Sequence, residues 1–290
     1  MVYWASARRT DEPLATNEEE SKWLHHGLET PPLADDGTID WDRVWLYRNK
    51  SGVQQPRPVF TGDVYRDVPA VDDDKPSTVM ILQHPCALLD KNNELRDVLL
   101  TAKVVDYKEV SAREWAGNFD VMPLVLATAK HQAVAFDQLA LVRSSELELT
   151  KRVACMEIEG VACLLQRWVN VNTRVIVPCW RFITVIEAQF AEADGMQAWC
   201  EERRHARVKP VPAVKEATNW LDEKSPDTGV PRRELLKEPA FRKHIVRQMQ
   251  EVARGRSQRE IAERDRVKAE RAQAEAEAAT AVNREVVDKQ

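Results

Sequence analysis

The chain has 290 residues, of which 43% are hydrophobic and 31% are charged. This composition excludes a fibrous or wholly disordered protein and leaves room for about two globular domains. The formal net charge of −5 disfavours non-specific nucleic-acid binding by the chain as a whole.

No segment is apolar enough to suggest membrane insertion or secretion. The longest apolar stretch, residues 169–182, is interrupted by polar and charged residues, whereas a bilayer span needs about 20 apolar residues. The first twenty residues contain the acidic run Glu18-Glu19-Glu20 in place of an apolar signal core. Five cysteines are scattered without any C-x-x-C pair. We therefore expect a cytoplasmic protein without membrane attachment, bound metal or cofactor.

Residues 1–40 are polar and punctuated by prolines, which predicts an N-terminal arm with one short helix around Glu18 to Leu28. A compact body is expected at residues 41–207. Its first part, residues 41–143, holds short apolar runs rich in β-branched residues, at 59–65, 78–82, 95–105, 121–126 and 133–142. No helical crossover separates these runs. They therefore predict antiparallel strands closing into a small β-barrel, with 78–82 buried on both faces.

A helical layer is expected at residues 144–207. Apolar residues from Val153 to Val169 recur mostly at three- and four-residue intervals, which predicts one helix of about five turns. Pro178 suits the first turn of the next helix.

The last third of the chain is polar. Residues 208–239 contain five prolines and predict a linker with one helical turn around Glu216 to Leu221. Residues 240–290 predict a long, charged helical tail, broken at Gly255 and restarted by the capping-box spacing that begins at Ser257. From residue 241 the tail holds twelve Lys and Arg against nine Asp and Glu, with a poor heptad. A partner-binding arm, with another protein as the partner, is the expectation for this tail.

The sequence Gln83-His84-Pro85-Cys86 comes directly after the predicted buried strand. If the chain stays extended, His84 and Cys86 project to the same side. An imidazole beside a thiol favours the reactive thiolate, although a buried thiol and a hydrogen-bonding histidine are the simpler interpretation. A catalytic triad would also need a carboxylate, for which Asp63 and Asp90 are the candidates.

A second polar and aromatic group comprises Arg167, Trp168 and Arg174. The two arginines would contact phosphates while the indole stacks on a base. The alternative places Trp168 in the core and both arginines on an exposed rim.

The run from Gly62-Asp63 to Pro69, with Lys75-Pro76 and an aliphatic strand after it, resembles the opening of the MazF/PemK toxin endoribonucleases. The resemblance covers residues 61–105 and implies a small SH3-like barrel. It places Lys75 where the family has the arginine that acts in RNA cleavage, and lysine cannot present the same planar fork. The Gly-Asp start is similar to that of uncharacterised bacterial and phage proteins as well.

The sequence thus predicts an α+β protein: an SH3-like barrel, packed helices and a helical tail. The first functional hypothesis is a cytoplasmic interaction or regulatory protein of bacterial or phage origin, acting in phage defence or superinfection exclusion by binding a macromolecule, with nucleic acid as an alternative partner. The second is an enzyme that uses Lys75, His84 and Cys86, either an endoribonuclease or a thiol-dependent enzyme.

Overall fold

The computed structural model describes residues 27–49, 56–117, 120–126 and 130–287, with side chains through residue 276. The chain divides into two compact units. Unit 1 comprises residues 1–53 and 61–185, and unit 2 comprises residues 54–60 and 186–290. The division falls within helix α5 (Cys179–His205). The predicted body of residues 41–207 therefore coincides with neither unit.

The predicted helix around Glu18 lies outside the described residues, except for its last two positions. The described end of the predicted arm is fixed in unit 1, because Leu28 and Ile39 are both buried. Leu33 and Ile39 form an isolated antiparallel bridge. At least residues 27–40 are thus part of the folded unit rather than a separate arm.

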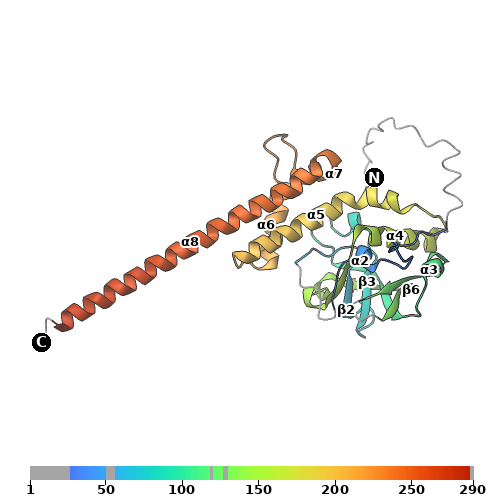
Figure 1. Cartoon of the computed structure of the whole chain (residues 1–290), viewed down its shortest axis with the longest axis horizontal. Helices are drawn as coiled ribbons and strands as arrows, with labels where there is room; N and C mark the ends of the chain where they lie inside the picture. Colours follow the sequence, from blue (N-terminus) through green and yellow to red (C-terminus); the bar gives the residue numbers. More distant parts are fainter. Residues whose placement is uncertain (1–26, 50–55, 118–119, 127–129, 288–290) are drawn as a thin grey trace. The chain divides into compact units, whose positions relative to one another are not determined.

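Unit 1 is built on a seven-stranded antiparallel sheet in the order β1-β7-β2-β3-β4-β6-β5, curled into a half-barrel (Figure 1). The mixed α+β class is as predicted. The strands are β1 (Trp45–Arg48), β2 (Val64–Val68), β3 (Ser77–Ile81), β4 (Val98–Asp106), β5 (Val121–Val125), β6 (His131–Arg143) and β7 (Arg152–Met156).

Strand β3 lies in the middle of the sheet between β2 and β4. Its consecutive residues Val79, Met80 and Ile81 are all buried, as expected for a strand covered on both faces. The prediction of a central, two-sided strand is therefore confirmed.

Strand β6 contributes to the curl of the sheet. Ala102 of β4 pairs with Leu139 of β6, and Val104 of β4 pairs with Val134 of β6. Between these pairs β6 has more residues than β4, so the extra residues of β6 form a bulge. Such bulges bend a strand and increase its twist.

Strand β7 corrects one expectation, because Arg152–Met156 pairs with both β1 and β2 instead of beginning a helix. The helix, α4 (Ile158–Thr173), starts only after Glu157, whose side chain accepts a hydrogen bond from the amide of Ile158. Val153, Cys155 and Met156 match a helical period by spacing alone, and their sheet partners are too distant in sequence to enter that pattern.

Two shorter helices, α2 (Trp41–Val44) and α3 (Ala112–Gly117), complete the described α-helices of unit 1. Helix α4 packs closely on α2, because a Cβ at Gly160 would lie 2.5 Å from the carbonyl oxygen of Val44. Trp115 of α3 is fully buried.

The Gly-Asp pair that opens β2 has a structural explanation. Gly62 has a φ of +85°, and a Cβ there would lie 2.9 Å from Met156 Sδ, so glycine is required. Asp63 accepts a hydrogen bond from Arg152 Nη1 at 3.2 Å, and both side chains are only 1% exposed. The motif thus joins β2 to β7 inside the sheet.

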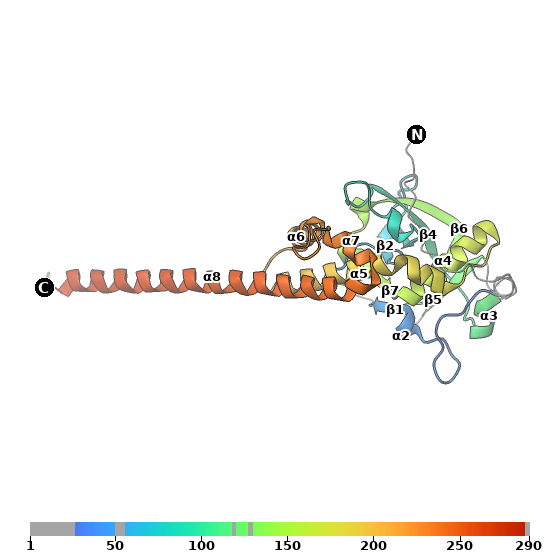
Figure 2. The same cartoon turned by 90° about the horizontal axis from the view of Figure 1, so that it is seen from above.

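Unit 2 contains most of α5, together with α6 (Pro210–Asp222), α7 (Arg232–Lys237) and α8 (Pro239–Val287). Helices α5 and α8 lie side by side within this unit (Figures 1 and 2). They run in the same direction, because successive contacts pair Glu187 with Arg242, Glu202 with Arg254, and Ala206 with Arg264. A shared core includes Trp199, Trp220, Leu236, Ile245 and Met249.

The predicted linker at residues 208–239 instead contributes to this core. Ala213, Ala217, Trp220 and Leu221 of α6 are buried, as are Leu235 and Leu236 of α7. The prolines start helices rather than interrupt them: Pro210 is in the first turn of α6, and Pro239 is the first residue of α8.

Helix α8 is continuous through Gly255, where the sequence predicts a break. A glycine inside a helix costs only about 1 kcal/mol relative to alanine. The hydroxyl of Ser257 donates to the carbonyl oxygen of Glu202 at 2.8 Å. It therefore joins α8 to α5 instead of capping a new helix.

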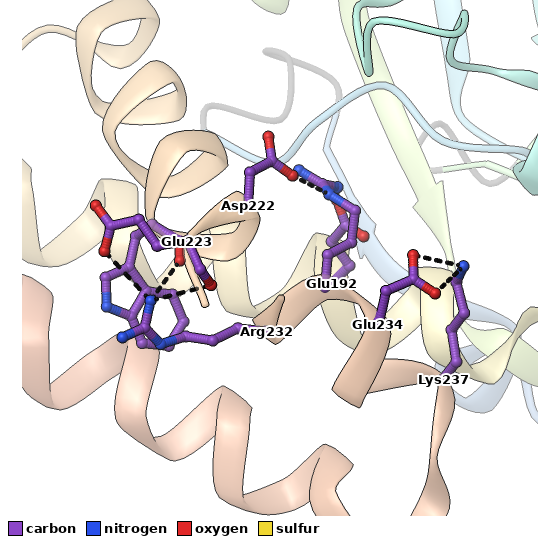
Figure 3. A network of polar contacts seen from close by, with 8 residues as sticks. Glu192, Asp222, Glu223, Arg232, Glu234 and Lys237 are labelled. Carbon is purple, nitrogen blue, oxygen red and sulfur yellow. Dashed lines mark hydrogen bonds and ion pairs between the residues drawn. The ribbon is translucent and has the colours of Figure 1, made fainter. Parts of the chain in front are cut away.

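Arginines connect the helices of unit 2. Arg233 of α7 contacts Glu192 of α5 and donates to Asp222 of α6 at 2.8 Å. Arg232 Nη1 donates to the carbonyl oxygen of Trp220 at 2.9 Å and contacts Glu223, while Glu234 pairs with Lys237 nearby (Figure 3). None of the helices in the described ranges has the length and hydropathy that a membrane span requires.

A short segment far from α5 in sequence completes unit 2. The Arg57 side chain is buried, contacts the Asp194 carboxylate, and lies 4.7 Å from the ring centroid of Phe190. Phe60 packs edge-on against Phe190 with ring centroids 5.6 Å apart. Cation–π and edge-to-face contacts of this kind favour the observed docking.

Candidate functional site

The best-defined polar pair of unit 1 is His84 with Cys86, in the turn after β3. Pro85–Ala87 forms a single 3-10 turn, and His84 caps it by accepting the Cys86 amide at Nδ1 over 3.3 Å. The same Nδ1 lies 2.8 Å from Cys86 Sγ. The two side chains therefore meet on one side, as the sequence predicts, although through a turn rather than an extended chain.

Hydrogen bonds from neighbouring segments hold this turn in place. Gln83 Nε2 donates to the carbonyl oxygen of Ala87 at 3.0 Å, and Gln83 Oε1 accepts the amide of Leu100 on β4 at 3.2 Å. The Thr61 hydroxyl donates to the carbonyl oxygen of Gln83. The His84–Cys86 pair thus lies on a rigid base, with His84 half-buried and Cys86 exposed.

The position of the proton can be assigned from these contacts. Burial lowers the pKa of His84 below its ordinary value, so the ring is neutral at pH 7. Because Nδ1 accepts the Cys86 amide, the mobile ring proton belongs on Nε2 and the thiol donates to Nδ1. An exposed thiol with a proton acceptor in contact is the arrangement needed for nucleophilic thiol chemistry.

The structure gives both candidate carboxylates other roles. Asp63 is paired with Arg152 inside the sheet. Asp90 accepts the amides of Asn92 and Glu94 at 2.8 and 3.0 Å, which stabilises the turn after the 3-10 segment. Neither candidate therefore completes a triad with His84 and Cys86.

Lys75 lies at the opposite end of β3 from His84. Lys75 precedes the strand Ser77–Ile81 and His84 comes after it, and an extended strand rises about 3.3 Å per residue, so their Cα atoms are roughly 20 Å or more apart. Lys75 is exposed in a turn where its amide donates to Asp73. The structure does not bring Lys75 into the His84–Cys86 site.

The predicted group of Arg167, Trp168 and Arg174 does not form one surface. Arg167 is fully buried, with its Cζ 3.7 Å from the Trp115 ring centroid and Nη2 donating to the Trp115 carbonyl oxygen at 2.5 Å. Burial lowers the pKa of Arg167 to about 10. Trp168 packs against Phe136, whereas Arg174 is exposed in a left-handed conformation at the end of α4. Because Arg167 is enclosed, it is unavailable to a phosphate.

A polar cluster that sequence reasoning missed links residue 29 to the start of α5. Glu29 Oε1 accepts the Cys179 amide at 2.8 Å and Gln166 Nε2 at 3.1 Å. The Glu29 amide donates back to Gln166 Oε1 at 2.8 Å. Cys179 Sγ lies 3.7 Å from Cys163 Sγ, and this contact together with burial raises the pKa of Cys179. The i, i+3 spacing of Cys163 and Gln166 indicates that these two side chains share one face of a helix. No local sequence pattern indicates that Glu29 contacts them.

Within the described ranges, no group of three or more His, Cys, Asp or Glu side chains is arranged to hold a metal ion. No protein-family model matches the chain. Among curated proteins, none has a significantly similar sequence.

Proposed function

We propose that the protein acts by binding another macromolecule through the part of α8 that lies beyond Arg264. The observation that supports this is a change of environment along one helix. Ile245, Met249, Ala253 and Ser257 are buried in unit 2. From residue 265 through 276 every described side chain is exposed except that of Val267, which is partly buried.

The helix continues to Val287. Residues 265–287 extend about 35 Å at 1.5 Å per residue. This segment is longer than the roughly 12–15 residues below which an isolated helix is only marginally stable in water. A helix of this length beyond its core is well suited to binding a macromolecular partner, with a protein and nucleic acid as the two classes that the sequence leaves open.

The biological setting that we propose is phage defence or superinfection exclusion in a bacterium or phage. It rests on the resemblance of the Gly-Asp start to that of uncharacterised bacterial and phage proteins. We likewise propose kinship of the half-barrel with the SH3-like barrel of MazF/PemK toxins. The Gly62-Asp63 pair that carries the resemblance has a role in folding here, which favours common architecture over common activity.

The test compares the full chain with a chain ending at Arg264, which keeps all residues of α8 that are buried among the described side chains, and the hydrogen bond from Arg264 to Ala206. Each is used to capture cross-linked macromolecules from cells, and the captured species are quantified. We expect at least one abundant species to be lost from the shortened chain while its unfolding temperature is unchanged. Identical sets from both chains would rule out this role for the end of α8.

The 2.8 Å contact between His84 and Cys86 favours a second candidate, a thiol-dependent activity. We expect His84→Ala to slow alkylation of Cys86 by iodoacetamide several-fold near pH 7, because the acceptor for the thiol proton is removed. The control is Lys75→Ala, at the opposite end of β3 from the turn. Gln83→Glu cannot serve as the control, because Gln83 holds the turn in place. Equal alkylation rates in wild type and His84→Ala would eliminate this candidate.

An endoribonuclease in which Lys75 and His84 act on one bond is a weaker candidate. The two residues lie at opposite ends of β3, and groups that act on one phosphate must lie within hydrogen-bond reach of it.

A further inference from the structure

Where α8 passes the end of α5, five cations gather that have no ion-pair partner in the described part of the chain. Arg207 and Lys209 lie on the turn between α5 and α6, and Arg264, Lys268 and Arg271 lie on α8. Arg264 Nη2 donates to the carbonyl oxygen of Ala206 at 3.0 Å, which places the turn beside the helix. We call these five residues the cation stripe.

The three α8 members lie on one face of the helix, because they are spaced i, i+4 and i+7. At 1.5 Å per residue they extend over about 10 Å of the helix axis. The next face has a net charge of −1: Arg266 pairs with Glu263 at 2.7 Å and with Glu270 at 3.7 Å. Glu275 lies on the same face as the stripe, four residues after Arg271, so the positive charge of this face is confined to residues 264–271.

Beyond the stripe members Arg207 and Lys209, the adjoining chain adds one exposed cation, Arg204. Residues 203–209 contain three Arg and one Lys and no Asp or Glu. Arg203 is buried and satisfied by Glu216 and Glu260, so those carboxylates are already occupied. The whole-chain net charge of −5 thus conceals a local positive surface.

Three classes of polyanion can be distinguished by what they require. A membrane surface needs an apolar helix face beside the cations, and the neighbouring face here is formed by Glu263, Arg266 and Glu270. A stable protein interface is enriched in aromatic residues at its centre and depleted in lysine, whereas the cation stripe has no aromatic member and includes Lys209 and Lys268. A phosphate backbone requires only accessible cations at intervals along its path.

We infer that the cation stripe binds the phosphate backbone of nucleic acid without reading its sequence. This inference rests on the proposed function and names the class of partner. It also moves the expected nucleic-acid contact from Arg167 and Arg174 in unit 1 to unit 2.

The test measures binding of the full chain to a labelled single-stranded RNA and to a labelled DNA duplex by fluorescence anisotropy, at salt concentrations from about 50 to about 200 mM. The variant is Lys268→Glu with Arg271→Glu, two exposed positions whose substitution leaves the core intact. The matched control is Lys243→Glu with Arg247→Glu, which makes the same change in net charge on the same helix. A third variant, Lys268→Gln with Arg271→Gln, removes both positive charges without adding negative ones. It separates the loss of the cations from new repulsion of the phosphates.

We expect the cation-stripe variant to bind at least about tenfold more weakly at low salt, and the slope of log affinity against log salt to fall by about two. The control should change affinity less than about threefold. Equal weakening of variant and control, or no binding by the wild-type chain, would overturn the inference. If wild type binds no nucleic acid but capture still depends on residues after Arg264, the partner is an acidic protein and the proposed function stands without this inference.

Discussion

Two buried arginines, Arg152 in unit 1 and Arg203 in unit 2, are paired with carboxylates of very different exposure. In unit 1, Arg152 and Asp63 are both 1% exposed, so the pair is sealed within the sheet. In unit 2, Arg203 is 2% exposed while its partners Glu216 and Glu260 are 29% and 50% exposed. In unit 1 both charged groups of the pair are therefore buried, whereas in unit 2 the carboxylates of Glu216 and Glu260 remain in contact with water. Loss of one partner should therefore be far more costly in unit 1.

The largest effect is expected for Asp63→Ala. It leaves the Arg152 guanidinium buried without its carboxylate, and breaking such a pair lowers the free energy of unfolding by about 3–5 kcal/mol. Urea unfolding measures the loss, and hydrogen exchange read on unit 1 peptides locates it. The double variant Asp63→Leu, Arg152→Met should recover much of the stability, since neither charge remains. A single variant as stable as wild type would remove the distinction between the units.

A smaller effect is expected for Arg203→Met in unit 2. The two carboxylates that it releases can hydrate, so the loss should be about 1–3 kcal/mol, confined to exchange of unit 2 amides. Arg247→Met is the control, because Arg247 and Glu251 form an exposed pair 2.9 Å apart that should contribute less than about 0.5 kcal/mol. If Arg203→Met proved as damaging as Asp63→Ala, exposure of the partner carboxylates would not be the deciding factor.

Two glycine substitutions should have opposite signs. Gly160→Ala would place a Cβ 2.5 Å from the Val44 carbonyl oxygen, so the close contact of α4 with α2 must open and unit 1 should lose about 1–3 kcal/mol. Gly255→Ala meets no atom within 4 Å and should stabilise α8 by up to about 1 kcal/mol. Thermal unfolding of both variants measures the signs, and a stabilised Gly160→Ala would show that this contact is loose.

The smallest effect concerns pH and His84. Since burial lowers the pKa of His84 from 6.5 in the folded chain, the unfolded chain binds a proton more readily. This group therefore reduces stability as pH falls below about 6.5 and has no such effect above it. His84→Gln should flatten the pH dependence of the free energy of unfolding between about pH 5 and 7. An unchanged slope would indicate that the ring is solvated in the folded protein.

Local sequence patterns predicted strands in the regions of β2 to β6, but predicted neither the first strand, β1, nor the last strand, β7. Val79, Met80 and Ile81 form an uninterrupted apolar run, and their place in the sheet is explained by that run. Strand β7 pairs with β1 and β2, which lie about 90 to 110 positions earlier in the chain, and no local pattern contains that information. The prediction of a linker at residues 208–239 failed for another reason. A proline that begins a helix and a proline that interrupts one are distinguished only by the packing of the residues around them.

The candidate site was predicted in part. The contact of His84 with Cys86 depends on a two-residue spacing and was foreseeable. The enclosure of Arg167 beneath Trp115, and the separation of Lys75 from His84, depend on tertiary packing and strand direction. The cation stripe was foreseeable only as a basic tail, because its asymmetry appears once Arg266 is seen to be paired and Lys268 is not.

The docking of Arg57 in unit 2 has a consequence for synthesis of the chain. Arg57 and its partner Asp194 are 137 residues apart. At 5–20 residues per second, the ribosome therefore synthesises Asp194 roughly 7–30 s after Arg57. Throughout that interval the 54–60 segment interrupts unit 1 before its docking site on α5 exists. Unit 1 must therefore fold while residues 54–60, which belong to unit 2, still lack their binding site. Neither unit corresponds to one continuous stretch of the chain, so a fragment that contains all of one unit also contains part of the other.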